Sequence, residues 1–214
     1  DTIPASISNL RVLESLLVKG LKGKVLLPYT LWSMEKLRHV HVNNYAAIAL
    51  QDSESTSSSQ ALNLVSLSCP YLLCGKGTED IMRKLLKLQK LSCVFSELRD
   101  DTGKCNHFPV LNFLTELESL NVLYSGRIAL PCKFEFPLNL KKLTLSKFRL
   151  PWDSISEIGR LPNLEVLKLL SRAFEGKVGE MKGGEFLKLK FLKLDSLTVA
   201  QWNASSDHLP QLQP

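Results

Sequence analysis

Features typical of membrane and nucleic-acid-binding proteins are scarce in this sequence. Aromatic residues make up only 7% of the 214 residues, and the net charge of +6 is modest. Nucleic-acid-binding domains usually combine interleaved aromatic residues with a dense basic cluster, so we expect no nucleic-acid partner. No run of about 18 apolar residues occurs, and therefore we predict no membrane span.

The five cysteines form neither a disulfide pattern nor a zinc pattern. Their odd number and their lack of close pairs favour reduced thiols and a cytoplasmic location. Cys69 and Cys74 have no second pair and no nearby histidine, so they are better interpreted as small buried side chains than as zinc ligands. His39 and His41 lie two residues apart on one predicted strand, where a third ligand is not evident. We therefore predict no metal site.

Motifs of catalysis and of nucleotide binding are also missing. The sequence contains neither a GxxxxGK(S/T) phosphate loop nor a GxSxG nucleophile elbow. The glycine-containing stretches at residues 75–77 and 183–184 are too short for a phosphate cradle and indicate turns. We predict no enzyme activity, no catalytic residues and no cofactor bound by this chain. The hydrophobic content of 44% is ample for one continuous core.

An apolar pattern, LxxLxxLxL, is repeated eight times along the chain. Successive copies follow one another at intervals of 23 to 29 residues, which is the range of leucine-rich repeats. A ninth copy begins at Leu209 and is truncated. The eight complete copies occupy residues 10–18, 34–42, 61–69, 85–93, 114–122, 137–145, 161–169 and 186–194.

The repeat predicts a fold because of where its leucines point. The closing LxL places two apolar residues on one side of a short strand, and the residues beside them face the other way. One repeat cannot bury its leucines alone, but stacked repeats can. We therefore predict an α/β leucine-rich-repeat solenoid with parallel strands on a concave face and irregular loops and short helices on a convex face. Residues 1–214 are expected to form a single domain, a fragment of a longer protein.

Between the repeats, two segments have helical spacing and two are polar insertions. Ile81 to Leu91 and Ile155 to Leu161 are predicted to contain short helices. Residues 51–60 and 99–107 are polar and are predicted to form loops on the convex side or rim. These loops could carry contacts or phosphorylation, although a tolerated insertion is the simpler interpretation.

The asparagine ladder of many leucine-rich repeats is absent. The GxIP strand of plant extracellular repeats is missing as well, so we predict an intracellular type whose turns satisfy their backbone groups less regularly. The positions where the ladder asparagine would stand are Leu21, Tyr45, Leu72, Ser96, Ser125, Phe148, Arg172 and Leu197.

Four stretches resemble repeats of plant nucleotide-binding leucine-rich-repeat immune receptors. Residues 3–10 (IPASISNL) are similar to the LPxSIxxLxxL opening repeat of these receptors, and residues 31–40 (LWSMEKLRHV) resemble their WxMxxLRHL repeat. Residues 161–169 match LPNLEVLKL. Residues 201–210 (QWNASSDHLP) resemble the WxASSDHFP stretch of the coiled-coil subclass from the potato and tomato family. That group includes late-blight resistance proteins and helper receptors required for cell death.

This resemblance implies the C-terminal part of an intracellular disease-resistance receptor. In the family that part restrains a nucleotide switch at rest and helps to recognise pathogen proteins. The implied partners are proteins: the receptor's own nucleotide-binding domain, a pathogen effector or another immune receptor. ATP or ADP is expected only in a nucleotide-binding part, which this sequence does not contain. A substrate-recruiting leucine-rich repeat of a ubiquitin-ligase adaptor is the alternative.

The exposed strand positions of repeats seven and eight predict a contact site. Repeats three to five present small polar residues, whereas Val166 and Phe191 are expected to lie side by side, as are Lys168 and Lys193, with Leu170 next to them. Apolar anchors flanked by charge are typical of protein interfaces. The predicted partner-binding residues, here called the concave patch, are Lys142, Val166, Lys168, Leu170, Phe191 and Lys193.

The charge distribution agrees with this site but allows a second interpretation. Residues 127–193 carry 14 basic and 7 acidic residues, so their net charge is +7 and that of the rest is −1. An acidic protein surface is therefore the expected partner. The alternative is that the lysines only keep a sheet face solvated and that valine and phenylalanine occur there because they suit strands.

Overall fold

The computed structural model describes residues 2–20, 23–48, 63–73, 76–96, 108–126 and 134–203. The polar insertions at residues 51–60 and 99–107 and the truncated ninth repeat lie outside these ranges. Within the described ranges, no helix is long and apolar enough to cross a membrane.

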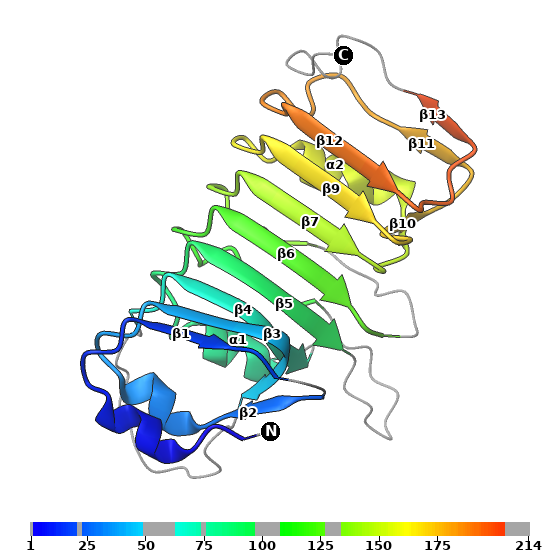
Figure 1. The fold of residues 1–214 in the computed structure, drawn as a ribbon. Helices are drawn as coiled ribbons and strands as arrows, with labels where there is room; N and C mark the ends of the chain where they lie inside the picture. The colour runs from blue at the N-terminus through cyan, green and yellow to red at the C-terminus, as the bar shows by residue number, and fades with distance from the viewer. Residues whose placement is uncertain are drawn as a thin grey trace.

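Each of the eight repeats contributes one strand to a single parallel sheet, and the strands follow one another in chain order (Figure 1). The first and last of them lie at opposite ends of an elongated, twisted stack (Figure 1). This arrangement confirms the predicted leucine-rich-repeat solenoid. The strands in order are β1 (Ser15–Val18), β3 (His39–Ile48), β4 (Ser66–Leu73), β5 (Lys90–Ser96), β6 (Ser119–Tyr124), β7 (Lys142–Ser146), β9 (Val166–Leu170) and β12 (Phe191–Asp195), with β2 (Val25–Leu27) beside β3.

Short elements connect these strands, and α1 and α2 lie behind the sheet in Figure 1. Two further parallel pairs, β8 with β10 and β11 with β13, lie near the C-terminal end. The connecting elements are η1 (Ala5–Asn9), η2 (Tyr29–Ser33), α1 (Lys76–Met82), β8 (Leu150–Pro151), η3 (Trp152–Ser154), α2 (Ile155–Gly159), β10 (Phe174–Glu175), β11 (Val178–Glu180) and β13 (Gln201–Asn203).

The two helix predictions have different outcomes. Helix α2 lies inside the predicted segment, which confirms that prediction. Helix α1 begins five residues before Ile81 and ends at Met82, so most of the predicted segment is not helical. The N–H groups of Leu85 and Leu88 donate to the carbonyls of Met82 and Leu85, which are turn bonds and not the i→i−4 bonds of an α-helix. Leu85 and Leu88 recur three residues apart because both fill the core from successive turns.

The alternation along the strands places the core behind the sheet. In β7 and β9 the paired leucines of LxL are completely buried, and the residues between them are partly exposed. The terminal strands are less covered, because each has a neighbouring repeat on one side only among the described residues. Leu194 in β12 is 38% exposed, whereas Leu169 at the matching position of β9 is 0% exposed.

A cluster of phenylalanines fills the core behind the central strands. Phe108 is its hub, because its ring centroid lies 5.0 Å from Phe95, 5.0 Å from Phe134, 5.8 Å from Phe148 and 6.3 Å from Phe136. All five rings are buried. Tilted and edge-on contacts at such distances are favourable for aromatic rings.

A regular hydrogen-bond ladder runs along the edge where the strands start. In each of the first seven repeats, one carbonyl accepts hydrogen bonds from two consecutive N–H groups of the next repeat, at 2.7–3.1 Å. These paired hydrogen bonds satisfy the backbone N–H groups at the strand starts and fix the separation of neighbouring repeats. The carbonyls belong to Glu14, Arg38, Val65, Gln89, Glu118, Lys141 and Glu165.

The opposite edge, where the strands end, is irregular. Strands β3 and β4 shift register between His41 and Ala46, and β4 and β5 shift between Ser68 and Tyr71. Five non-glycine residues near the ends of β7, β9 and β12 adopt left-handed conformations with φ between 49° and 64°, which the structure tolerates because neighbouring repeats bond their backbones. They are Lys147, Arg149, Ser171, Arg172 and Ser196.

Candidate functional site

The six residues of the concave patch alternate with the core residues of β7, β9 and β12 and therefore lie together on the open face of the sheet. Figure 1 shows α1 and α2 on the other side of the sheet. The register places Val166 between Lys142 and Phe191, and Lys168 beside Lys193. Because parallel strands lie about 4.8 Å apart, these side chains are lateral neighbours. The side-by-side positions expected from the repeat spacing are therefore present in the structure.

The apolar members of the concave patch remain accessible. Phe191 is 47% exposed, which is high for a phenylalanine, and Val166 and Leu170 are half-buried. The ammonium group of Lys168 lies 5.6 Å from the centroid of the Phe191 ring, within the range of a cation–π contact. The patch therefore presents an exposed aromatic ring, a residue type that is enriched in protein interfaces, with a cation over it.

One cation of the patch has an acidic partner that the sequence analysis did not anticipate. Lys193 Nζ lies 3.2 Å from Asp195 Oδ2, two residues further along the same strand. The Ser196 hydroxyl, which donates to Asp195 Oδ1 at 2.8 Å, and then the Lys193 ammonium hold the pKa of Asp195 below its usual range. The signal was present in the sequence, because residues i and i+2 of a strand share one face.

Two other cations of the patch have no carboxylate partner. Lys142 is exposed and Lys168 is half-buried, and neither forms an ion pair among the described residues. The adjacent charged row is different, because Lys141 pairs with Glu118 at 2.8 Å and Lys190 pairs with Glu165 at 3.2 Å. The patch therefore contains uncompensated positive charge, whereas the row beside it neutralises itself.

Strands β3 to β6 carry a different surface. His39 Nδ1 lies 2.8 Å from Ser66 Oγ, and the Asn121 side chain donates to Ser92 Oγ at 3.2 Å. These small polar groups satisfy one another across neighbouring strands, which leaves little for a partner to bind. His41 Nε2 lies 3.2 Å from Asn43 Oδ1. Among the described residues, no group of three or more His, Cys, Asp or Glu side chains is placed to hold a metal ion.

Strict alternation after the closing LxL predicts that Pro70 and Val94 are exposed on the open face, at the position that Leu170 occupies in β9, but both are buried. Val94 keeps the unbroken register of β5 with β6 and lies outside the core cluster, so it stays on the open face and is buried there. Pro70 instead lies at a register shift and pairs with the buried Ala46. An extra residue in a strand reverses the face on which the following side chains lie. In β7, β9 and β12 no such shift occurs, and these positions stay in register.

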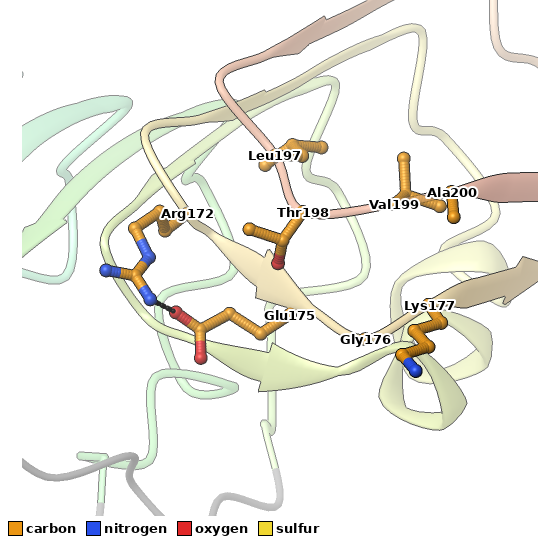
Figure 2. A pocket seen from close by; sticks show the side chains of 8 residues that line it. All are labelled: Arg172, Glu175, Gly176, Lys177, Leu197, Thr198, Val199 and Ala200. Atoms are coloured by element: carbon orange, nitrogen blue, oxygen red, sulfur yellow. Dashed lines mark ion pairs between the residues drawn. The ribbon is translucent and has the colours of Figure 1, made fainter.

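An open groove of about 510 Å³ lies at the strand-end edge of the last repeats (Figure 2). Arg172 and Glu175 line one end, Lys177 lines the other, and residues 197–200 form the opposite wall (Figure 2). Arg172 Nη2 lies 2.7 Å from Glu175 Oε1, and Arg149 Nε lies 3.9 Å from the same oxygen. The acid is thus already neutralised, and the groove is too open to enclose a small molecule. The repeat pattern of the sequence does not predict this groove.

The chain is similar in sequence to late blight resistance proteins and their homologs. It is 37% identical over 221 residues to a putative late blight resistance protein homolog of Solanum demissum and covers 28% of that protein. A second such homolog is 35% identical over 221 residues, and the late blight resistance protein R1-A of the same species is 34% identical over 223 residues; the chain covers 16% of each. In all three the alignment includes 100% of this chain. No family model matches the sequence.

Proposed function

We propose that this chain, which is homologous over its full length to one region of the late blight resistance proteins, is a non-catalytic, protein-binding region of a cytoplasmic plant disease-resistance receptor. The homology favours such a receptor over a ubiquitin-ligase adaptor. The chain spans between 16% and 28% of the lengths of these relatives. Nucleotide binding, and with it any ATP or ADP, is then the work of another part of the receptor.

The observation that carries this proposal is the concave patch. Phe191 and Val166 supply adjacent apolar contacts on a rigid sheet, and Lys142 and Lys168 supply positive charge that nothing in the described chain compensates. A partner surface with carboxylates around an apolar centre would complement both features. Charge complementarity of this kind sets orientation and association rate as well as affinity.

We infer that the partner at rest is an acidic surface of the receptor's own nucleotide-binding portion. The contact would hold the receptor inactive, and a pathogen protein or a second immune receptor would compete for the same face. The resemblance of residues 161–169 to repeats of nucleotide-binding immune receptors, and of residues 201–210 to their coiled-coil subclass, supports this assignment. Releasing the contact would permit signalling and, in a leaf, the hypersensitive response.

The test is Lys142→Glu combined with Lys168→Glu. Lys193 is left unchanged because Asp195 already neutralises it. We expect the double variant to bind the purified nucleotide-binding portion of a receptor of this family at least about tenfold more weakly, because charge reversal replaces attraction by repulsion. In the intact receptor it should raise cell death in the absence of a pathogen.

Lys90→Glu is the matched control, because Lys90 is also exposed on the open face but lies on β5, outside the patch. Both variants should fold normally, since exposed substitutions usually change stability by no more than about 0.5 kcal/mol. If the double variant is folded and neither its partner binding nor its resting activity changes, these lysines only keep the surface solvated and the proposed contact is wrong.

A further inference from the structure

A second group of exposed apolar residues lies beside the concave patch, in the turns that precede the strands. The turns that precede β7, β9 and β12 are built alike, because the N–H groups of Leu140, Leu164 and Leu189 each donate to the carbonyl three residues earlier. The register of the strands aligns these turns, so their outward positions coincide in successive repeats. Those positions are Leu138, Pro162 and Leu187, here called the start flank.

The start flank exposes apolar surface that no described residue covers. Leu138 is 68% exposed and Leu187 is 59% exposed, and Pro162 between them is exposed as well. Their turns are held in place by the residues that follow, since Asn163 Nδ2 donates to the Leu138 carbonyl at 3.1 Å and Lys188 Nζ donates to Asn163 Oδ1 at 2.8 Å. The three side chains therefore form a fixed apolar stripe across three repeats.

The charges beside the stripe are predominantly basic. Arg160 is exposed two residues before Pro162, and Lys188 follows Leu187; neither forms an ion pair among the described residues. The nearby Lys190–Glu165 pair neutralises itself. A second copy of this chain would bring the same cations together, so self-association through this flank is disfavoured. An occupant with carboxylates beside its apolar side chains fits instead.

The spacing of the stripe indicates the form of that occupant. Neighbouring repeats lie about 4.8 Å apart, and one α-helical turn advances about 5.4 Å. Apolar side chains at positions i, i+4 and i+7 of a helix can therefore meet the three stripe residues in succession. Same-face residues of an extended strand lie about 6.7 Å apart and fall out of step by the third contact.

We propose that the start flank is the docking surface for an acidic amphipathic helix of the partner protein. The flank joins the concave patch through Lys190 and Phe191, which follow Leu187 on the same repeat. One partner can thus contact the open face with one part of its surface and the flank with a helix. This inference extends the proposed function and rests on it for the identity of the partner.

The experiment uses a displayed library of helical peptides, with leucine fixed at i, i+4 and i+7 and the flanking positions random, selected against the whole chain. We expect aspartate and glutamate to be enriched at the flanking positions. The selected peptides should bind the Leu138→Ser, Leu187→Ser variant at least tenfold more weakly, since each lost leucine contact is worth about that factor. The matched control is Leu10→Ser with Leu86→Ser, which removes two other exposed leucines outside the flank.

Several results would overturn the inference: no enriched peptide, enrichment of basic flanking residues, or equal binding to both leucine variants. Binding of the chain to vesicles containing phosphatidylserine, lost in the Leu138→Ser, Leu187→Ser variant, would make the flank a membrane surface instead. If the nucleotide-binding portion responds to the lysine reversal but not to the leucine changes, the proposed function stands and the inference falls. If it responds to the leucine changes but not to the lysine reversal, the start flank is a docking surface and the concave patch is not. Circular dichroism and thermal melting confirm that each variant is folded.

Discussion

Replacing Phe108 by alanine should destabilise the solenoid more than any change on its surface. Phe108 is 3% exposed, and its ring contacts four other phenylalanine rings. Truncation removes the transfer free energy of a buried ring and leaves a cavity that these rigid neighbours fill poorly. Such changes cost about 3–5 kcal/mol. In a chain of this size, a loss of about 1 kcal/mol lowers the melting temperature by roughly 2–4 °C, so we expect a decrease of about 6–20 °C.

The assay is thermal unfolding followed by circular dichroism, with Phe191→Ala as the matched control. Phe191 is 47% exposed, so the same truncation there forfeits only part of the transfer free energy, about 1 kcal/mol. Phe108→Leu keeps most of the volume and should cost about 1.5 kcal/mol or less. If Phe108→Ala melts no lower than Phe191→Ala, the cluster does not support the core as argued.

Two further predictions concern the C-terminal tryptophans and the charged row. Gly179→Ala should destabilise the fold by about 1–3 kcal/mol and change tryptophan fluorescence, because an added Cβ would lie 2.9 Å from the Trp202 ring and 3.2 Å from the Trp152 ring. Gly183→Ala is the control, because a Cβ added there has nothing within 4 Å, and it should change neither the stability nor the fluorescence. The Glu118 carboxylate, through its hydrogen bond and its charge, raises the pKa of Lys141, so this pair stabilises the fold below the ordinary lysine pKa of 10.5 and loses that contribution as the pH rises through the raised value. Lys141→Met should therefore lower the melting temperature at neutral pH, and a difference that persists undiminished above the raised pKa or in 1 M salt would contradict this.

The repeat pattern predicted most of the fold because leucine burial is periodic. Every LxL copy lies in a strand of the one sheet, and the lateral neighbours Val166 and Phe191 follow directly from the spacing. The failures have local causes. The position of α1 was wrong because Leu85 and Leu88 imitate helical spacing while belonging to turns. Pro70 was placed on the open face because a bulge is invisible to a template that assumes strict alternation.

The strand positions of the concave-patch residues were predicted from the repeat spacing, but their electrostatics were not. The sequence suggested two adjacent lysines in want of acidic partners, whereas the structure shows Asp195 pairing with one of them. The start flank was missed for a different reason. In the sequence Leu138 follows the buried Pro137 and Leu187 follows the buried Phe186, and only the turn geometry reveals that the two leucines face outward. Exposure of an apolar residue next to a buried one cannot be inferred from composition.

The carbonyls that each accept two hydrogen bonds lie at the strand starts, so this edge of the solenoid has the same geometry in successive repeats. The opposite edge, where the strands end, varies from repeat to repeat. Repeat lengths range from 23 to 29 residues, yet from Glu14 to Lys190 every strand start is held by the same pair of bonds. The two longest repeats contain the polar segments 51–60 and 99–107, which follow the ends of β3 and β5 in the sequence. Insertions can thus accumulate there without displacing the side chains of the open face or of the start flank. A solenoid built in this way can change the length of its loops during evolution and still present the same exposed side chains in the same register.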